Sequence, residues 1–375
     1  MDLAAARETF ESSQDLTVGI EEEWAIIDPH TLELTPRFEA LRDAGARDPM
    51  LAEAISGELI SSEIEIRSGR GETLAHAREL QREARRRLFA LADQHGVALA
   101  ATGTHPLSDY REQKIIDTEH YHRVEDGLKY VAWRNNTFAL QVHVGVRGGD
   151  RAVKACDRLR PVLPLLLAIS ANSPFLDGRD SGLHSARTQT FTKSFPRCGV
   201  PDPFGDWAAW NDYVALLLET NSIVEFTQLW WSVRPHHSFG TIEVRICDAQ
   251  TTAPEADALA ELIVACVAQA LREVDAGDLP PDVPGRLIEE NMWRAIRYGQ
   301  DGRLLDLEAP RPYEFPAAEA IDRLKAWTGA DVALPELNGA QRQRRMIDAG
   351  ATPFEVFKQC VEETRATYPA QERVL

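Results

Sequence analysis

The chain has 375 residues, of which 44% are hydrophobic and 27% are charged, a balance typical of a globular protein with a substantial core. Its formal net charge of −18 argues against nucleic acid as a partner, because proteins that bind it usually present a basic face. The longest apolar run, residues 162–171, is interrupted by Pro164 and is far shorter than the roughly 20 residues that cross a bilayer.

The five cysteines are scattered and show no CxxC pairing, which favours reduced thiols over disulfides or a zinc site. The N-terminal segment is acidic and lacks the apolar stretch of a signal peptide. We therefore expect a cytoplasmic protein that has neither a nucleic-acid nor a membrane partner.

The first two-thirds of the chain contains all the predicted strands. Alternating apolar residues predict strands over 17–27, 58–67, 97–103, 133–146, 223–233 and 239–247, the last two separated by residues 234–237. Helical spacing predicts helices over 73–95, 150–171 and 206–220. The segment 178–203, rich in Gly, Ser, Arg and Pro, predicts a long functional loop.

From residue 253 onward the pattern is helical almost to the end. Helices are predicted over 254–274, 284–298, 316–327, 336–349 and 353–367. This segregation indicates an α+β fold rather than regular βαβ alternation. Since no repeat or linker interrupts the pattern, we expect a single domain over 1–375 with a mainly helical C-terminal part from about 253.

Charged residues recur two apart inside the predicted strands. The pairs are Glu21 with Glu23, Glu63 with Glu65, and Glu243 with Arg245. Because strand side chains alternate faces, each pair points to one side, about 6.6 Å apart along the strand. Carboxylates gathered on one face repel each other unless cations lie among them, and Mg²⁺ is the natural candidate for hard oxygen ligands.

Other polar residues could complete such a face. Gln141 and His143 share one side of their predicted strand and could supply further ligands, while Arg187, Arg234 and Arg245 offer planar guanidinium groups for phosphate or carboxylate. Carboxylates, a metal ion and arginines together describe a phosphoryl-transfer site. No P-loop or GxGxxG motif occurs, so any ATP must be bound by another fold.

A simpler interpretation, without a metal site, competes with the phosphoryl-transfer site. A single pair of glutamates in a strand is usually a solvated sheet face, although three such segments together count against that explanation. The histidines at 120, 122, 236 and 237 are interpreted as loop or substrate-edge residues. The helix predicted over 73–95 contains five arginines that accompany Glu79 and Glu83, and we interpret them as part of a solvated helix face. They are Arg78, Arg82, Arg85, Arg86 and Arg87.

With these motifs in order, the chain resembles the bacterial type-2 glutamate–cysteine ligases, or YbdK-type carboxylate–amine ligases, whose fold is related to glutamine synthetase. The motifs that carry the resemblance are Gly19–Glu23, 58–68, 101–106, 138–146, 168–174, 178–182 and 234–248. Each motif is weak alone, and the ordered set is specific.

The resemblance implies an antiparallel sheet whose concave face holds ATP and two or three divalent cations, Mg²⁺ or Mn²⁺, with helices on the other side. It places Arg245 near the transferred phosphoryl group and assigns Arg187 and Arg234 to anion binding. Gln141 stands where many relatives have a histidine ligand, and Glu63 joins the metal face by alternation alone. By similarity, the metal positions are Glu21, Glu23, Glu58, Glu65 and Glu243.

The activity implied is ATP-dependent ligation of a carboxylate, glutamate, to an amine such as cysteine through an acyl phosphate. His143 is one candidate for the base that deprotonates the amine, and a homo-oligomer is also implied by the resemblance. Two alternatives stay open: a guanidino-type kinase on the same fold, and a nucleotide-binding regulatory protein that has lost catalysis.

Overall fold

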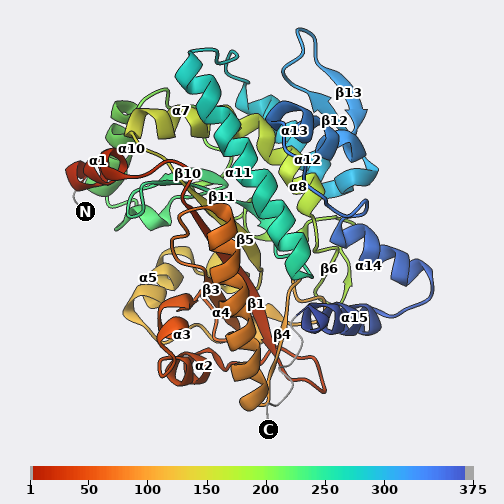
Figure 1. The fold of residues 1–375 in the computed structure, drawn as a ribbon. Helices are drawn as coiled ribbons and strands as arrows, with labels where there is room; N and C mark the ends of the chain where they lie inside the picture. Colours follow the sequence, from red (N-terminus) through yellow and green to blue (C-terminus); the bar gives the residue numbers. More distant parts are fainter. Residues whose placement is uncertain (1–2, 368–375) are drawn as a thin grey trace.

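A computed structural model describes residues 3–367, and its centre is a seven-stranded, fully antiparallel sheet (Figure 1). The strand order is β10-β11-β5-β1-β3-β2, and β4 pairs with the end of β1. These strands are β1 (Val18–Ile27), β2 (Ile55–Ser56), β3 (Glu63–Arg67), β4 (Ala98–Ala100), β5 (Ala139–Gly145), β10 (Val233–His236) and β11 (Thr241–Asp248).

Short two-stranded pairs lie outside this sheet. They are β6 (Phe175–Leu176) with β7 (Arg179–Asp180), β8 (Cys198–Gly199) with β9 (Trp230–Trp231), and β12 (Arg303–Asp306) with β13 (Tyr313–Pro316). The helices before residue 200 are α1 (Leu3–Ser12), α2 (Phe38–Gly45), α3 (Pro49–Ala54), α4 (Leu74–Gln94), α5 (Glu119–Leu128), α6 (Tyr130–Trp133), α7 (Gly149–Leu159), α8 (Leu163–Ser170) and α9 (Ala186–Thr190). The later helices are α10 (Trp207–Glu219), α11 (Ala253–Ala276), α12 (Gly285–Tyr298), α13 (Ala320–Thr328), α14 (Gly339–Asp348) and α15 (Pro353–Ala366).

One face of the sheet is covered by helices α4, α7, α8 and α11, of which α4 and α11 run in front of the strands in Figure 1. Apolar side chains of the central strands, among them Ile20, Val142 and Val244, lie in the core beneath these helices. The alternating residues Glu21, Gln141 and Glu243 point to the opposite side, which we call the acidic face. The alternation of the strands thus separates the core from the polar residues.

Local signals set the bounds of the covering helices. Helix α4 begins after Thr73, whose Oγ1 accepts a hydrogen bond from the His76 amide at 3.2 Å. It ends before Gly96, which takes a left-handed φ of 69°. Helix α11 begins with a capping box between Thr252 and Glu255 and ends at left-handed Gly277.

The α+β class with an antiparallel sheet is confirmed, as are the long helices of the C-terminal part. Within residues 3–367, no helix combines the length and apolar character needed to cross a membrane. The single-domain organisation stays a prediction.

Several predicted boundaries are wrong. The strand predicted over 58–67 begins only at Glu63, and the one predicted over 133–146 begins at Ala139, after helix α6. Residues 234–236, predicted as a connection, belong to strand β10. Alternation continues into neighbouring loops by chance, so it marks the existence of a strand better than its ends.

Two interpretations of polar side chains are also wrong. Arg85 does not belong to a solvated helix face: its side chain is fully buried, 2.5 Å from Glu22 and 2.8 Å from Asp257. His237 is not a loop-edge residue either, since it is buried and its Nε2 lies 2.7 Å from the indole nitrogen of Trp210. In both cases a partner from a distant element makes burial of the polar group possible.

Candidate active site

The acidic face lines a cavity of about 410 Å³. Strands β1, β3, β5, β10 and β11 all contribute to its floor, and α5, α9 and the loops around residues 225–230 form its walls. All the site residues predicted from the sequence line this cavity: Glu21, Glu23, Glu58, Glu65, Gln141, His143, Arg187, Arg234, Glu243 and Arg245. Glu63 lines it as well.

The first potential metal group combines Glu21, His143 and Glu243, whose ligand atoms lie within 4.8 Å of one another. Sheet register brings them together, because His143 is directly opposite Glu243, and Glu21 is opposite the nearby Gln141. The His143 Nε2 lies 3.4 Å from Glu21 and 3.9 Å from Glu243, while its Nδ1 is hydrogen-bonded to Thr241 at 3.0 Å.

The charged residues around this first group shift one another's pKa values toward the ionised forms. Burial opposes ionisation of Glu243, but Arg234, Arg245 and His143 outweigh it and hold the pKa of Glu243 well below its usual range. Burial likewise disfavours the charged imidazole of His143, yet Glu21 and Glu243 raise its pKa. The first group is therefore an electrostatically balanced cluster, with Glu243 ionised.

The second group, Glu23, Glu58 and Glu65, also brings its ligand atoms within 4.8 Å of one another. Glu23 and Glu65 are opposite each other on β1 and β3, and Glu58 reaches them from the loop before β3. Burial, followed by repulsion from neighbouring carboxylates, raises the pKa of Glu58 and of Glu65 well above the ordinary value. Glu63 behaves in the same way, and its Oε2 is buried without a hydrogen-bond partner among the described residues.

Both groups fit divalent cations. Three carboxylates that resist ionisation together would be relieved by a bound cation, and their oxygens suit Mg²⁺ or Mn²⁺. The first group adds an imidazole nitrogen, because the buried His143 Nε2 makes no hydrogen bond within residues 3–367. The donor sets thus agree with two adjacent cation positions on one face of the sheet.

Two arginines are fixed around Glu243. The Arg234 Nε and Nη2 donate to the two oxygens of Glu243 at 2.6 and 3.3 Å, and its Nη1 donates to the carbonyls of Thr227 and Leu229. Arg245 donates to both Glu243 and the side-chain oxygen of Gln141. Arg234 is thereby largely occupied by protein partners, whereas Arg245 lies between the two metal groups.

Gln141 links the two groups by hydrogen bonds. While its oxygen accepts from Arg245, its Nε2 donates to Glu23 at 2.6 Å. The backbone amide of Ala139 donates to the other oxygen of Glu23 at 2.5 Å. Gln141 therefore orients the side chains of Arg245 and Glu23.

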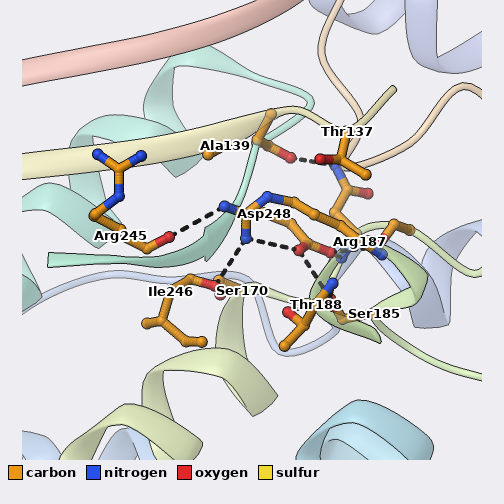
Figure 2. Close-up of polar contacts among 12 residues, drawn as sticks. Thr137, Ala139, Ser170, Ser185, Arg187, Thr188, Arg245, Ile246 and Asp248 are labelled. Carbon is orange, nitrogen blue, oxygen red and sulfur yellow. Dashed lines mark hydrogen bonds and ion pairs between the residues drawn. The ribbon is translucent and has the colours of Figure 1, made fainter. Parts of the chain in front are cut away.

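Arg187 reaches the cavity from α9. Figure 2 shows its guanidinium group between the carboxylate of Asp248 and the main-chain carbonyls of Arg245 and Ile246. Asp248 was missed in the sequence, although it ends the strand that contains Glu243 and Arg245. Simple alternation places Asp248 on the core side of that strand, which is why no signal pointed to it.

A second cavity of about 520 Å³ adjoins the first at Glu21 and His143. Hydroxyl groups of Thr9, Ser12 and Thr17 line it, and the exposed ring of Phe239 stands where the two cavities meet. The first metal group therefore lies at the junction of two compartments that together exceed the size of one small metabolite.

The sequence model of glutamate–cysteine ligase family 2 matches residues 17–366, and the chain belongs to that family.

Curated relatives agree over almost the whole chain. A Rubrobacter xylanophilus protein named "Putative glutamate–cysteine ligase 2-1" is 38% identical, with 93% of this chain and 95% of the relative covered. A protein of Natronomonas pharaonis named glutamate–cysteine ligase is 34% identical, with 93% and 95% covered.

Solved structures share the fold. A glutamate–cysteine ligase from Francisella tularensis, in complex with AMP, matches with a TM-score of 0.64 at 13% identity, covering 95% of this chain and 89% of that one. A bifunctional glutathione synthetase from Pasteurella multocida matches with a TM-score of 0.67 at 12% identity. The match covers 99% of this chain, which spans about half of that longer protein, 54%.

Proposed function

We propose that this chain is an ATP-dependent carboxylate–amine ligase that joins glutamate to an amine, with cysteine as the reference acceptor. The observation that carries the proposal is that the two potential metal groups lie on one sheet face, with Arg245 between them. Membership of glutamate–cysteine ligase family 2 supports the same reaction.

The two cavities suggest how the substrates are arranged. The nucleotide would occupy the compartment that adjoins Glu21 and His143, with its phosphates directed toward Glu243. The acid would bind in the acidic cavity, where Arg187 offers a guanidinium group to its carboxylate. The reacting carboxylate and the terminal phosphate would then meet beside Arg245.

A carboxylate is a poor electrophile, so the reaction needs activation. Transfer of the terminal phosphoryl group of ATP to a carboxylate oxygen yields ADP and an acyl phosphate. The amine nitrogen then attacks the acyl carbon, the C–O bond to phosphate breaks, and the nitrogen loses a proton. Arg245 stabilises the negative charge on the transferred group, and Glu243 and Gln141 hold Arg245 in place.

Divalent cations would be held by Glu21, His143 and Glu243 and by Glu23, Glu58 and Glu65, and when bound they would neutralise phosphate charge. The position of His143 between two carboxylates favours a ligand role over that of the base. The use of Mn²⁺ in place of Mg²⁺, a cytoplasmic location and a homo-oligomeric assembly stay predictions.

The decisive test measures ADP release from Mg-ATP across a panel of acids and amines. We expect ADP that depends on glutamate and rises with one particular amine, and we expect its loss in Glu243→Ala. The exposed Glu362→Ala serves as the matched control and should retain full activity.

Other outcomes would identify the alternatives. ADP formed with a guanidino compound alone would indicate a kinase, and nucleotide binding without any turnover would indicate a regulatory protein. Equal activity of Glu243→Ala and the parent would contradict the proposed site.

A further inference from the structure

Asp248 lies on the acidic face because strand β11 contains a bulge. Val244 pairs with Val142, but the next regular pair is Cys247 with Leu140, so two residues of β11 oppose the single residue Gln141. The extra residue reverses the alternation and brings Asp248 opposite Ala139, on the same face as Glu243. Without the bulge, Cys247 would occupy that side of the strand.

The carboxylate of Asp248 is completely buried and is held by three hydrogen bonds. Its Oδ2 accepts from the amide of Asn172 at 2.8 Å and from the hydroxyl of Ser173 at 2.7 Å. Its Oδ1 accepts from the hydroxyl of Ser185 at 2.9 Å and lies 3.6 Å from Nη1 of Arg187. Gly103 packs so closely that a methyl group at that position would lie 2.7 Å from the carboxyl carbon.

The same bulge supplies the other partners of Arg187. Its Nη1 donates to the carbonyl of Ile246 and its Nη2 to the carbonyl of Arg245, each at 3.1 Å (Figure 2). The remaining nitrogen, Nε, is buried and makes no hydrogen bond to any residue in 3–367. The contacts of Asp248 and β11 therefore fix one side of the guanidinium and leave Nε unpaired within residues 3–367, in a side chain that lines the acidic cavity.

We propose that Asp248 is a positioning residue that orients Arg187 toward the carboxylate-bearing substrate. The proposal rests on the function proposed above, because it assumes that Arg187 binds the acid. Asp248 neutralises the buried guanidinium on the side away from the cavity and connects it to the segment 172–185. The side chain of Arg187 is then held in one conformation, so it can bind an anion without first changing its rotamer.

The test compares Asp248→Asn, Arg187→Lys and the double variant, with separate KM values for glutamate and ATP. Asp157→Asn is the matched control, since Asp157 also accepts main-chain hydrogen bonds, but from Phe204 and Gly205 and not from the segment that holds Arg187. We expect Asp248→Asn to raise the KM for glutamate about tenfold, with the KM for ATP changed by less than about twofold. In the Arg187→Lys background the same substitution should change the glutamate KM by less than about twofold, because its effect passes through Arg187.

A purely structural role predicts a different result. Equal increases in both KM values, or independent effects that multiply in the double variant, would overturn the proposal. If Asp248→Asn does not fold, Ser185→Ala removes one donor to the carboxylate and leaves the guanidinium contacts intact. A rise in the glutamate KM alone would then support the proposal, and an unchanged value would contradict it.

Glutamate binding measured by calorimetry separates this proposal from the proposed function. Binding to the parent without turnover would contradict the ligase function, and weaker binding by Asp248→Asn would still support the positioning role. Turnover by the parent with unchanged binding and KM in Asp248→Asn would contradict the positioning role alone. No glutamate binding by the parent would overturn both.

Discussion

Three consecutive glutamates near the start of the chain meet different environments. Glu21 and Glu23 point into the acidic cavity, whereas Glu22 points to the helix-covered side and accepts hydrogen bonds from Gln81 and Arg85 of α4. Strand alternation assigns their sides, and each side brings a different set of partners. At the scale of single residues, the site consists of carboxylates with opposite tendencies: Glu243 is held ionised by arginines, and Glu65 resists ionisation.

This difference predicts how Glu65→Gln behaves. Without a metal ion we expect it to stabilise the fold by about 1 kcal/mol, because it removes one repelling charge from the second group. Loss of a ligand should lower the turnover at least about 100-fold. Thermal unfolding in EDTA and in Mg²⁺, together with the ADP assay, would check both effects, and a less stable metal-free variant would contradict the repulsion.

At the scale of elements, β11 and α4 place side chains where their sequence patterns do not predict them. Strand β11 supplies Glu243, Arg245 and Asp248 to one face only because its register shifts between Val244 and Cys247. Helix α4 is attached to the sheet and to α11 by Arg85, which bridges Glu22 and Asp257.

The role of Arg85 gives a prediction for α4. Replacement by Ala should destabilise the protein by about 3–5 kcal/mol, since it leaves the buried carboxylate of Glu22 without its cation. The exposed Arg82→Ala on the same helix should change stability by less than about 0.5 kcal/mol. Urea unfolding of the two variants provides the comparison, and equal midpoints would contradict a structural role for Arg85.

At the scale of the whole molecule, the sheet gathers residues from positions 21 to 245 into one charged cavity. Helices on the opposite face provide the apolar burial that stabilises the fold. The molecule therefore tolerates an acidic face whose carboxylates would repel each other in isolation.

This arrangement predicts how stability depends on pH. The pKa values of Glu58, Glu63 and Glu65 are raised above the ordinary 4.5, chiefly by burial and then by neighbouring carboxylates, so the folded state binds protons more tightly than the unfolded state. Their contribution is complete below 4.5 and is lost as the pH rises through the raised values, by up to about 1.4 kcal/mol per pH unit for each group. Glu243 acts in the opposite sense, because its lowered pKa removes stability only as the pH falls below 4.5.

In EDTA, we therefore expect the free energy of unfolding to fall as the pH rises from about 5 to about 8. Saturating Mg²⁺ should reduce or reverse that fall, because it binds the ionised carboxylates. Urea unfolding across this range would check the prediction, and identical pH profiles with and without Mg²⁺ would contradict a metal site in this cavity.

Local patterns in the chain were enough to predict the sides of the strands, the α+β class and most of the cavity's charged residues. They were enough because alternation at period two is a local property of the chain, and the glutamates and arginines interrupt an otherwise apolar pattern. Three features became visible only in the folded chain: the burial of Arg85, the link that Gln141 forms between Arg245 and Glu23, and the position of Asp248 on the acidic face. Each of these depends on contacts between residues far apart in the chain or on a one-residue register shift, and neither leaves a periodic signal in the sequence.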